Sequence, residues 1–179
     1  HSSFAARKIR PHREWALLHL KYSRWVNVAT NHILQQPYLV GHNANEAGFY
    51  KIATYAQGST LTDEQWDDFN MQTFFCPSNL EAAHRSRRHT PVWRFQYNAD
   101  WENTRLYPTS GAYHGVEFNM IFGESAEITG IAESDAQRQL QVQMRSAWGS
   151  FIADPEHGLK ALGWPSYDPD GESTLLRSR

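Results

Sequence analysis

A single glutamate follows a short predicted strand in a polar loop. Tyr38–Gly41 is typical of a short buried strand, and the polar residues 42–45 after it predict a loop. In an open α/β sheet, reacting groups lie beyond the carboxyl ends of the strands. A carboxylate placed there can accept a hydrogen bond from an imidazole N–H, which fixes the histidine tautomer and stabilises the imidazolium. Glu46 is therefore a candidate partner for a catalytic histidine, and a solvent-exposed loop acid is the alternative.

A histidine flanked by small residues offers the second reactive group. Gly111 and Gly115 lie on either side of it and permit backbone turns that a β-carbon would resist. Its loop follows a second predicted strand, Trp93–Tyr97, in which ring and non-ring residues alternate. An imidazole on such a loop can move a proton near neutral pH. We therefore take His114 as a candidate general base; the alternative is a locally hydrogen-bonded histidine, one of nine in the chain.

Helices are expected to flank these two strands. Thr62 is a predicted helix cap, because two acidic residues follow it in the first turn, and helix is expected again over Phe74–His84. Further helices are predicted for residues 117–122 and 133–152, with Ser134 near the cap of the latter. Short strands separated by helices indicate an α/β layer arrangement. Two convincing strands are nevertheless too few for a complete sheet.

Ordered motifs around both candidate residues resemble the type-B carboxylesterase/lipase family, most closely its fungal members. Asn45-Glu46-Ala47-Gly48 resembles the family's N/D-x-E-x-G setting of the triad glutamate. Gly111–Gly115, followed by Glu117 and Ile121-Phe122-Gly123, resembles its G-x-x-H-G segment. The resemblance covers roughly residues 36–176. It implies an α/β-hydrolase fold, with Glu46 and His114 as acid and base of a Ser-Glu-His triad.

The resemblance also implies ester hydrolysis through an acyl-enzyme, with a serine upstream of Glu46 as nucleophile. Ser2, Ser3 and Ser23 do not lie in a G-x-S-x-G elbow, and no glycine-rich oxyanion loop is present. Gly123–Glu127 is similar to the family's G-E-S-A-G elbow, but it ends in Glu and follows both the histidine and a predicted helix. We therefore reject Ser125 as the nucleophile.

Two aromatic residues near His114 are candidates for substrate binding. Tyr113 and Phe118 flank the predicted catalytic loop and are expected to line an acyl or alcohol pocket. The family resemblance implies no metal or organic cofactor. His42, His84, His89 and His157 also lack the spacing of a metal site, so none is expected.

The chain divides into two parts by its resemblance to the family. Residues 1–35 match poorly, whereas residues 36–179 are expected to be the C-terminal part of an α/β-hydrolase domain: late strands of a mostly parallel sheet with flanking helices. The lone chain is expected to be inactive, with a companion polypeptide carrying the N-terminal half and the catalytic serine. A non-catalytic esterase-like binding module and an acyltransferase are the alternatives. Members of the family that the chain resembles are often secreted, so the resemblance implies that this protein is secreted.

Composition limits the remaining choices. The formal charge of −2 gives no global basic field for nucleic acid or anionic membranes, and no apolar run approaches the ~20 residues of a membrane span. Aromatic residues reach 13%, which requires a core or a wide apolar cleft. The single cysteine, Cys76, is expected to be a buried thiol or to pair outside this sequence. The basic stretch 84–89 is interpreted as a solvated helix end.

Overall fold

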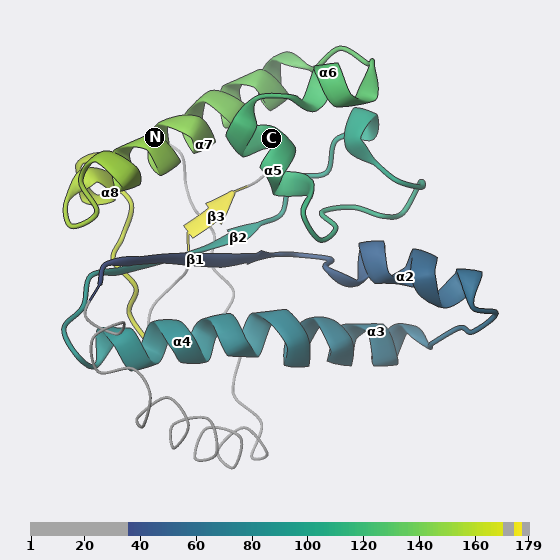
Figure 1. The fold of residues 1–179 in the computed structure, drawn as a ribbon, viewed down its shortest axis with the longest axis horizontal. Helices are drawn as coiled ribbons and strands as arrows, with labels where there is room; N and C mark the ends of the chain where they lie inside the picture. Colours follow the sequence, from purple (N-terminus) through teal and green to yellow (C-terminus); the bar gives the residue numbers. More distant parts are fainter. Residues whose placement is uncertain (1–35, 170–173, 177–179) are drawn as a thin grey trace.

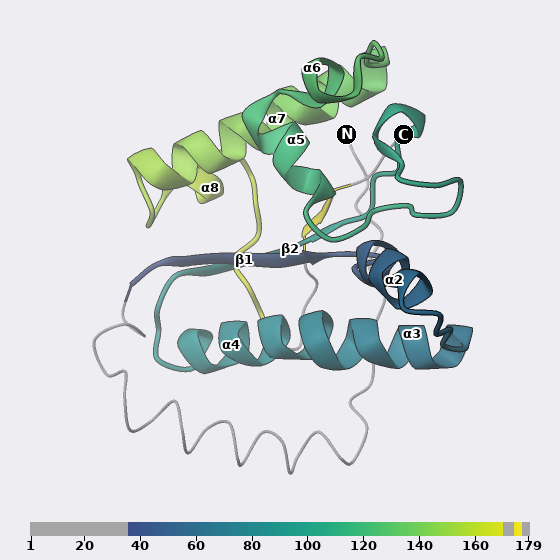
Figure 2. The ribbon, with the colours of Figure 1, turned by 45° about the vertical axis from the view of Figure 1, so that its right-hand side comes forward.

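The computed structural model describes residues 36–169 and the strand residues 174–176. Three parallel strands form the sheet: β1 (Tyr38–Asn43), β2 (Val92–Tyr97) and β3 (Thr174–Leu176), in the order β1-β2-β3. Helices cover both faces (Figures 1 and 2): α3 (Asp63–Asn70) and α4 (Cys76–Ser86) lie below the sheet, and α5 (Val116–Phe122), α7 (Asp135–Ala153) and α8 (Gly158–Ala161) lie above it. The two predicted strands are confirmed, and β3 is a third that the sequence pattern did not indicate.

The connection from β1 to β2 is helical throughout most of its length. It contains α2 (Ala47–Ala56), α3 (Asp63–Asn70), the π-helix η2 (Met71–Phe75) and α4 (Cys76–Ser86). Thr62 caps α3 as predicted: its hydroxyl accepts from Gln65 N at 3.2 Å, and its own N–H donates to Gln65 Oε1 at 2.8 Å. This reciprocal pair is a capping box, which satisfies two backbone donors at the helix start.

Replacing Thr62 by alanine is expected to lower the free energy of unfolding by about 1 kcal/mol, because the hydroxyl acceptor is lost. Thr62→Ser keeps that acceptor and should stay near the wild type. Chemical denaturation followed by circular dichroism measures both variants. Equal stability of Thr62→Ala and Thr62→Ser would show that the capping box contributes nothing.

β2 is the central strand and is buried on both faces, as expected of a parallel sheet covered by helices. Trp93 and Phe95 face α7, where their rings meet Phe151 and Trp148 at centroid distances of 6.0 and 5.0 Å. Val92 packs with small residues of α4 on the opposite face. Alternate side chains of β2 therefore point into two different buried layers, and neither face of the strand is exposed to solvent.

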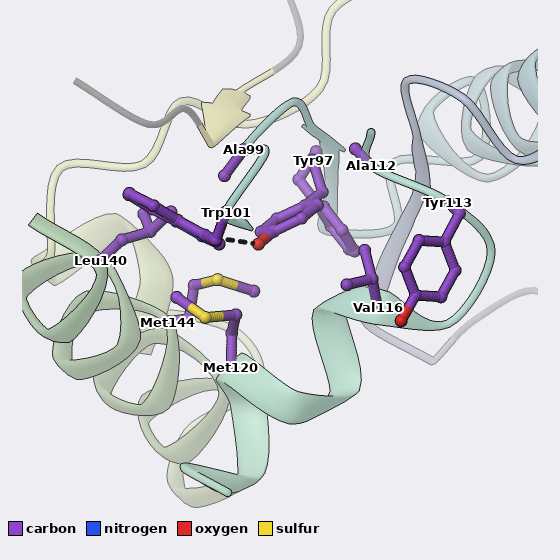
Figure 3. Packing of buried hydrophobic residues seen from close by; sticks show 10 residues of the cluster. Tyr97, Ala99, Trp101, Ala112, Tyr113, Val116, Met120, Leu140 and Met144 are labelled. Atoms are coloured by element: carbon purple, nitrogen blue, oxygen red, sulfur yellow. Dashed lines mark hydrogen bonds between the residues drawn. The ribbon is translucent and has the colours of Figure 1, made fainter. Parts of the chain in front are cut away.

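Most of the segment between β2 and β3 packs above the sheet. It comprises η3 (Glu102–Thr104), α5 (Val116–Phe122), α6 (Ser125–Thr129), α7 (Asp135–Ala153) and α8 (Gly158–Ala161). Tyr97, Met120 and Met144 join β2, α5 and α7 in one core, and Trp101 Nε1 donates to Tyr97 Oη at 3.1 Å (Figure 3). Ser134 caps α7 through Gln137 N at 3.1 Å, as predicted. In the two described stretches, no helix combines the length and apolar character needed to cross a bilayer.

One local interpretation of the sequence was wrong, and a second holds only in part. His42 and Asn43 belong to β1 and not to the following loop, because both continue its pairing with β2. The basic stretch 84–89 does lie at the end of α4, and Arg87, Arg88 and His89 are exposed as expected, but Arg85 is an exception. It is 5% exposed, bonds Glu81 at 2.9 Å and stacks 3.9 Å from the centre of the Tyr38 ring. Its guanidinium covers the strand face, which a count of basic residues does not reveal.

Candidate active site

The loops after β1 and β2 meet at the carboxyl end of the sheet. Asn43 pairs with Tyr97 at the end of the ladder, and the backbone beyond stays joined, with Asn45 N donating to Ala112 O at 3.0 Å. The side-chain Nδ2 of Asn45 adds a bond to Ser110 O at 2.8 Å. Gly48 permits this close approach, since a β-carbon there would lie 2.5 Å from the Ser110 carbonyl oxygen. Glu46 and the loop before α5 are thus held side by side.

Glu46 and His114, 68 positions apart, form a direct contact. Glu46 Oε2 lies 2.7 Å from His114 Nδ1, and Glu46 Oε1 accepts from Asn43 N at 2.6 Å. The glutamate side chain is 4% exposed and the imidazole is 44% exposed. A buried carboxylate on Nδ1 places the proton there and leaves Nε2 as the acceptor, which is the arrangement a general base requires. The expected contact is present, and the catalytic roles of both residues stay a prediction.

Burial controls the ionisation of the glutamate. Burial raises the pKa of Glu46 above its ordinary 4.5, and the charge of Glu117 adds to this; the hydrogen bonds from Asn43 N and His114 act in the opposite direction. A buried carboxylate is costly to ionise because little water solvates its charge. A protonated imidazole beside it therefore stabilises the ionised form strongly. The pair is therefore suited to stabilise positive charge on His114.

The raised pKa of Glu46 predicts how stability depends on pH. Below pH 4.5 the carboxyl is protonated in both the folded and the unfolded chain, so its burial costs no ionisation. As pH rises through the raised folded pKa, the unfolded chain releases its proton more readily, and the folded state loses stability. Glutamine does not ionise. The Glu46→Gln variant should therefore become more stable relative to the wild type as the pH rises from 4.5 toward neutrality.

Denaturation midpoints measured from pH 4 to 8 test this. The comparison uses His114→Gln with and without Glu46→Gln, so that titration of the imidazole does not contribute. The prediction would be contradicted if, with rising pH, the His114→Gln protein became more stable relative to the variant that also carries Glu46→Gln.

Aromatic rings enclose one side of the imidazole. The rings of Phe74, Tyr50 and Phe49 lie 5.1, 5.4 and 6.4 Å from the His114 ring, centre to centre. Phe74 comes from the π-helix, while its neighbour Phe75 contacts His42 at 5.1 Å. Helical π-insertions are frequent at functional sites. Here the insertion supplies an apolar wall that excludes water from part of the imidazole.

These three rings were not among the predicted site residues. Phe49 lies on α2 just after Glu46, and its place one turn from the acid is a signal that sequence reasoning could have used. Phe74 carries no such signal, because 40 positions separate it from His114 and only the fold brings them together.

The two predicted substrate-binding residues lie in different surroundings. Tyr113 is 9% exposed and its ring packs in the core beside Val116 (Figure 3). Phe118 lies on α5 and is 56% exposed. A substrate-binding role stays a prediction for both, and the buried ring of Tyr113 makes Phe118 the more accessible of the two.

Two further side chains with nucleophilic chemistry, the buried Ser125 and the half-buried Cys76, are poorly suited to attack a substrate. Ser125 is 0% exposed, and its hydroxyl points to Met120 Sδ at 3.6 Å. Burial raises the pKa of the Cys76 thiol to about 11, so this thiol stays protonated at neutral pH. Across residues 36–169, no group of three or more His, Cys, Asp or Glu side chains is arranged to hold a metal ion.

Comparison with known proteins gives a consistent result. The model of the carboxylesterase family matches residues 18–178, which reaches into the segment before residue 36. Secreted lipase 5 of Gibberella zeae is 27% identical over 146 residues, which are 78% of this chain and 27% of the relative. Chlorogenic acid esterase of Aspergillus niger is 27% identical over 116 residues, 56% of this chain and 22% of the relative.

Solved structures show the same fold. A thermophilic PNB esterase superposes with a TM-score of 0.61 at 23% identity, over 80% of this chain and 35% of that structure. A carboxylesterase of Geobacillus stearothermophilus gives a TM-score of 0.56 at 13% identity, over 79% of this chain and 36% of that structure. The chain spans about a quarter to a third of these proteins. Its sheet and flanking helices are part of an α/β-hydrolase fold. Because the family model covers most of the sequence, the chain belongs to the carboxylesterase family.

Proposed function

We propose that this chain supplies the acid and the base of a serine carboxylesterase. The observation that carries the proposal is the 2.7 Å contact between a buried glutamate and a half-exposed histidine, beyond the carboxyl ends of neighbouring parallel strands. Family membership supports the same activity. His114 is the general base and Glu46 is the residue that orients it.

The proposed reaction proceeds through an acyl-enzyme. A serine hydroxyl attacks the ester carbonyl while His114 Nε2 removes its proton, and the imidazolium then protonates the leaving alcohol. Water repeats the sequence and releases the acid. Glu46 holds the proton on Nδ1 throughout and stabilises the imidazolium. Backbone N–H groups outside this chain would hold the oxyanion.

The nucleophile is proposed to lie outside these 179 residues, on a further segment of the same polypeptide or on a companion chain. Among residues 36–169, no serine hydroxyl is hydrogen-bonded to His114. In the described sheet, β1 pairs on one side only, which leaves an edge where another strand can add. A parallel strand added there would have its carboxyl end at the same edge of the sheet as Glu46 and His114, where a serine elbow could follow it.

The proposed substrate is a carboxylic ester of small or lipid-like size. The relatives are named as a secreted lipase, a chlorogenic acid esterase and a para-nitrobenzyl esterase, so esters are common to all three. We propose secretion on the name of the first relative.

Labelling with a fluorophosphonate probe tests the proposal. The full polypeptide or complex that contains this chain is expected to hydrolyse p-nitrophenyl acetate and to carry the label on a serine within a G-x-S-x-G elbow outside these 179 residues. The isolated chain should neither turn over nor take the label. Hydrolysis by the isolated chain that is lost on both His114→Ala and Ser125→Ala would overturn the proposal.

A further inference from the structure

Asn43 contacts both loops of the candidate active site. Its backbone N–H donates to Glu46 Oε1 at 2.6 Å. Its side-chain Nδ2 donates to the carbonyl oxygen of Tyr113, the residue before His114, at 2.7 Å, and also to Glu117 Oε2. One residue at the end of β1 therefore holds the acid by its main chain and the base-carrying loop by its side chain.

The amide of Asn43 is fixed in this orientation. The residue is 2% exposed, and both groups that face its Nδ2 are acceptors, so only the NH₂ end satisfies them. Its Oδ1 is buried and meets no donor among the described residues. A buried polar atom without a partner is unfavourable and calls for an explanation. The two bonds that the NH₂ makes toward the His114 loop provide one.

Glu117 is the second half of this connection. It lies in the first turn of α5, three positions after His114, and is half-buried. Its carboxylate accepts from Asn43 Nδ2, and a hydrogen bond to an ionised acceptor is stronger than a neutral one. Its charge also reaches the acid, because Glu117 raises the pKa of Glu46. Other groups facing Glu46 are the imidazole of His114 and the main chain of Asn43.

We propose that Asn43 and Glu117 are positioning residues, a clamp that sets the loop of Glu46 against the loop of His114. The assignment rests on the proposed function, since positioning matters only if the pair is catalytic. The clamp acts on orientation: without it, the Tyr113 carbonyl and α5 lose their tie to β1, and the imidazole is free to leave the carboxylate. A misplacement of about 1 Å can reduce a rate on the order of 10²-fold.

Variants of Glu117 separate the hydrogen bond from the charge. Glu117→Gln keeps an oxygen for Asn43 Nδ2 and should retain kcat within a few-fold, while Glu117→Ala should lower kcat about 10- to 100-fold with little change in KM. Glu117→Gln also removes a like charge near Glu46, so a pH-dependent step that requires ionised Glu46 should move to lower pH. A purely structural role of Glu117 would lower thermal stability in Glu117→Ala without a selective loss of kcat that glutamine restores.

Asn43→Ala should lower kcat to a similar degree, and Asn45→Ala is the matched control. The side-chain amide of Asn45 also bonds across the two loops, to Ser110 O, but it is hydrogen-bonded to neither the Glu46 nor the Glu117 carboxylate. It should affect thermal stability while changing kcat less than Asn43→Ala. Should Asn43→Ala fail to fold, the Glu117 pair still decides the question.

A second measurement does not depend on hydrolysis. The proton between His114 Nδ1 and Glu46 should give a low-field ¹H NMR signal in the full protein, absent in His114→Ala. The clamp requires that this signal persists in Glu117→Gln and Asn45→Ala and broadens or moves upfield in Asn43→Ala and Glu117→Ala. If these signals respond but no ester is hydrolysed, the proposed function fails, although Asn43 and Glu117 still hold the two loops together. Unchanged signals and unchanged kcat in Asn43→Ala and Glu117→Ala would overturn the clamp.

Discussion

Replacing His114 by alanine is expected to lower kcat for ester hydrolysis on the order of 10⁵- to 10⁶-fold, the loss seen when a triad histidine is removed. The methyl group cannot accept the proton of the attacking hydroxyl or return it to the leaving alcohol. KM should change little, because the exposed imidazole contributes its main interaction in the transition state. The assay is p-nitrophenyl acetate hydrolysis by the full polypeptide or complex.

The matched control is a second histidine–carboxylate pair in the same chain. His157 Nδ1 lies 3.3 Å from Asp154 Oδ1, but both side chains are largely exposed, at 70% and 53%. His157→Ala should leave kcat within twofold of the wild type, to judge by the small effects of most surface substitutions. A loss for His157→Ala equal to that for His114→Ala, or full activity of His114→Ala, would show that His114 is not the base.

The elements that the sequence predicted well are those defined by local chemistry. The caps at Thr62 and Ser134 depend on a side chain and a backbone N–H three residues away, so a short window contains all the information. The β2 strand was recognisable because its alternating rings are confined to a few residues. These signals do not require knowledge of any distant segment.

Features that depend on packing between distant segments were not predictable. β3 joins the sheet beside β2, and nothing in its three residues distinguishes it from a turn-rich tail. Arg85 is buried because Glu81 and the Tyr38 ring lie beside it. The π-insertion that directs Phe74 to the imidazole also depends on tertiary contacts.

The candidate site shows the same division. Residue type and spacing identified Glu46 and His114 only as two of several candidates, and the family motifs selected them. No role was predicted for Asn43, because it was assigned to a loop, where its amide would face solvent. In the structure it extends β1 by the two positions that place its Nδ2 against Tyr113 O and Glu117. A strand boundary misjudged by two residues thus concealed a positioning group.

Glu46→Gln is expected to lower kcat on the order of 10⁴-fold, with KM nearly unchanged. Glutamine preserves the shape of the side chain, but turning its NH₂ toward His114 makes Nδ1 an acceptor and moves the ring proton to Nε2, where it blocks the general base. Turning its oxygen toward His114 keeps the tautomer, but it places the NH₂ against the Asn43 N–H, which is itself a donor. In either orientation the imidazolium also loses a negative partner.

Glu46→Asp and Asp154→Asn complete this test. Glu46→Asp keeps the charge on a shorter side chain and should retain more activity than Glu46→Gln, because ionic stabilisation survives at a longer distance. Asp154→Asn makes the same carboxylate-to-amide change at the exposed pair and should leave kcat within twofold. Activity of Glu46→Gln within tenfold of the wild type would mean that the buried carboxylate holds the loops together but neither orients His114 for catalysis nor stabilises its imidazolium.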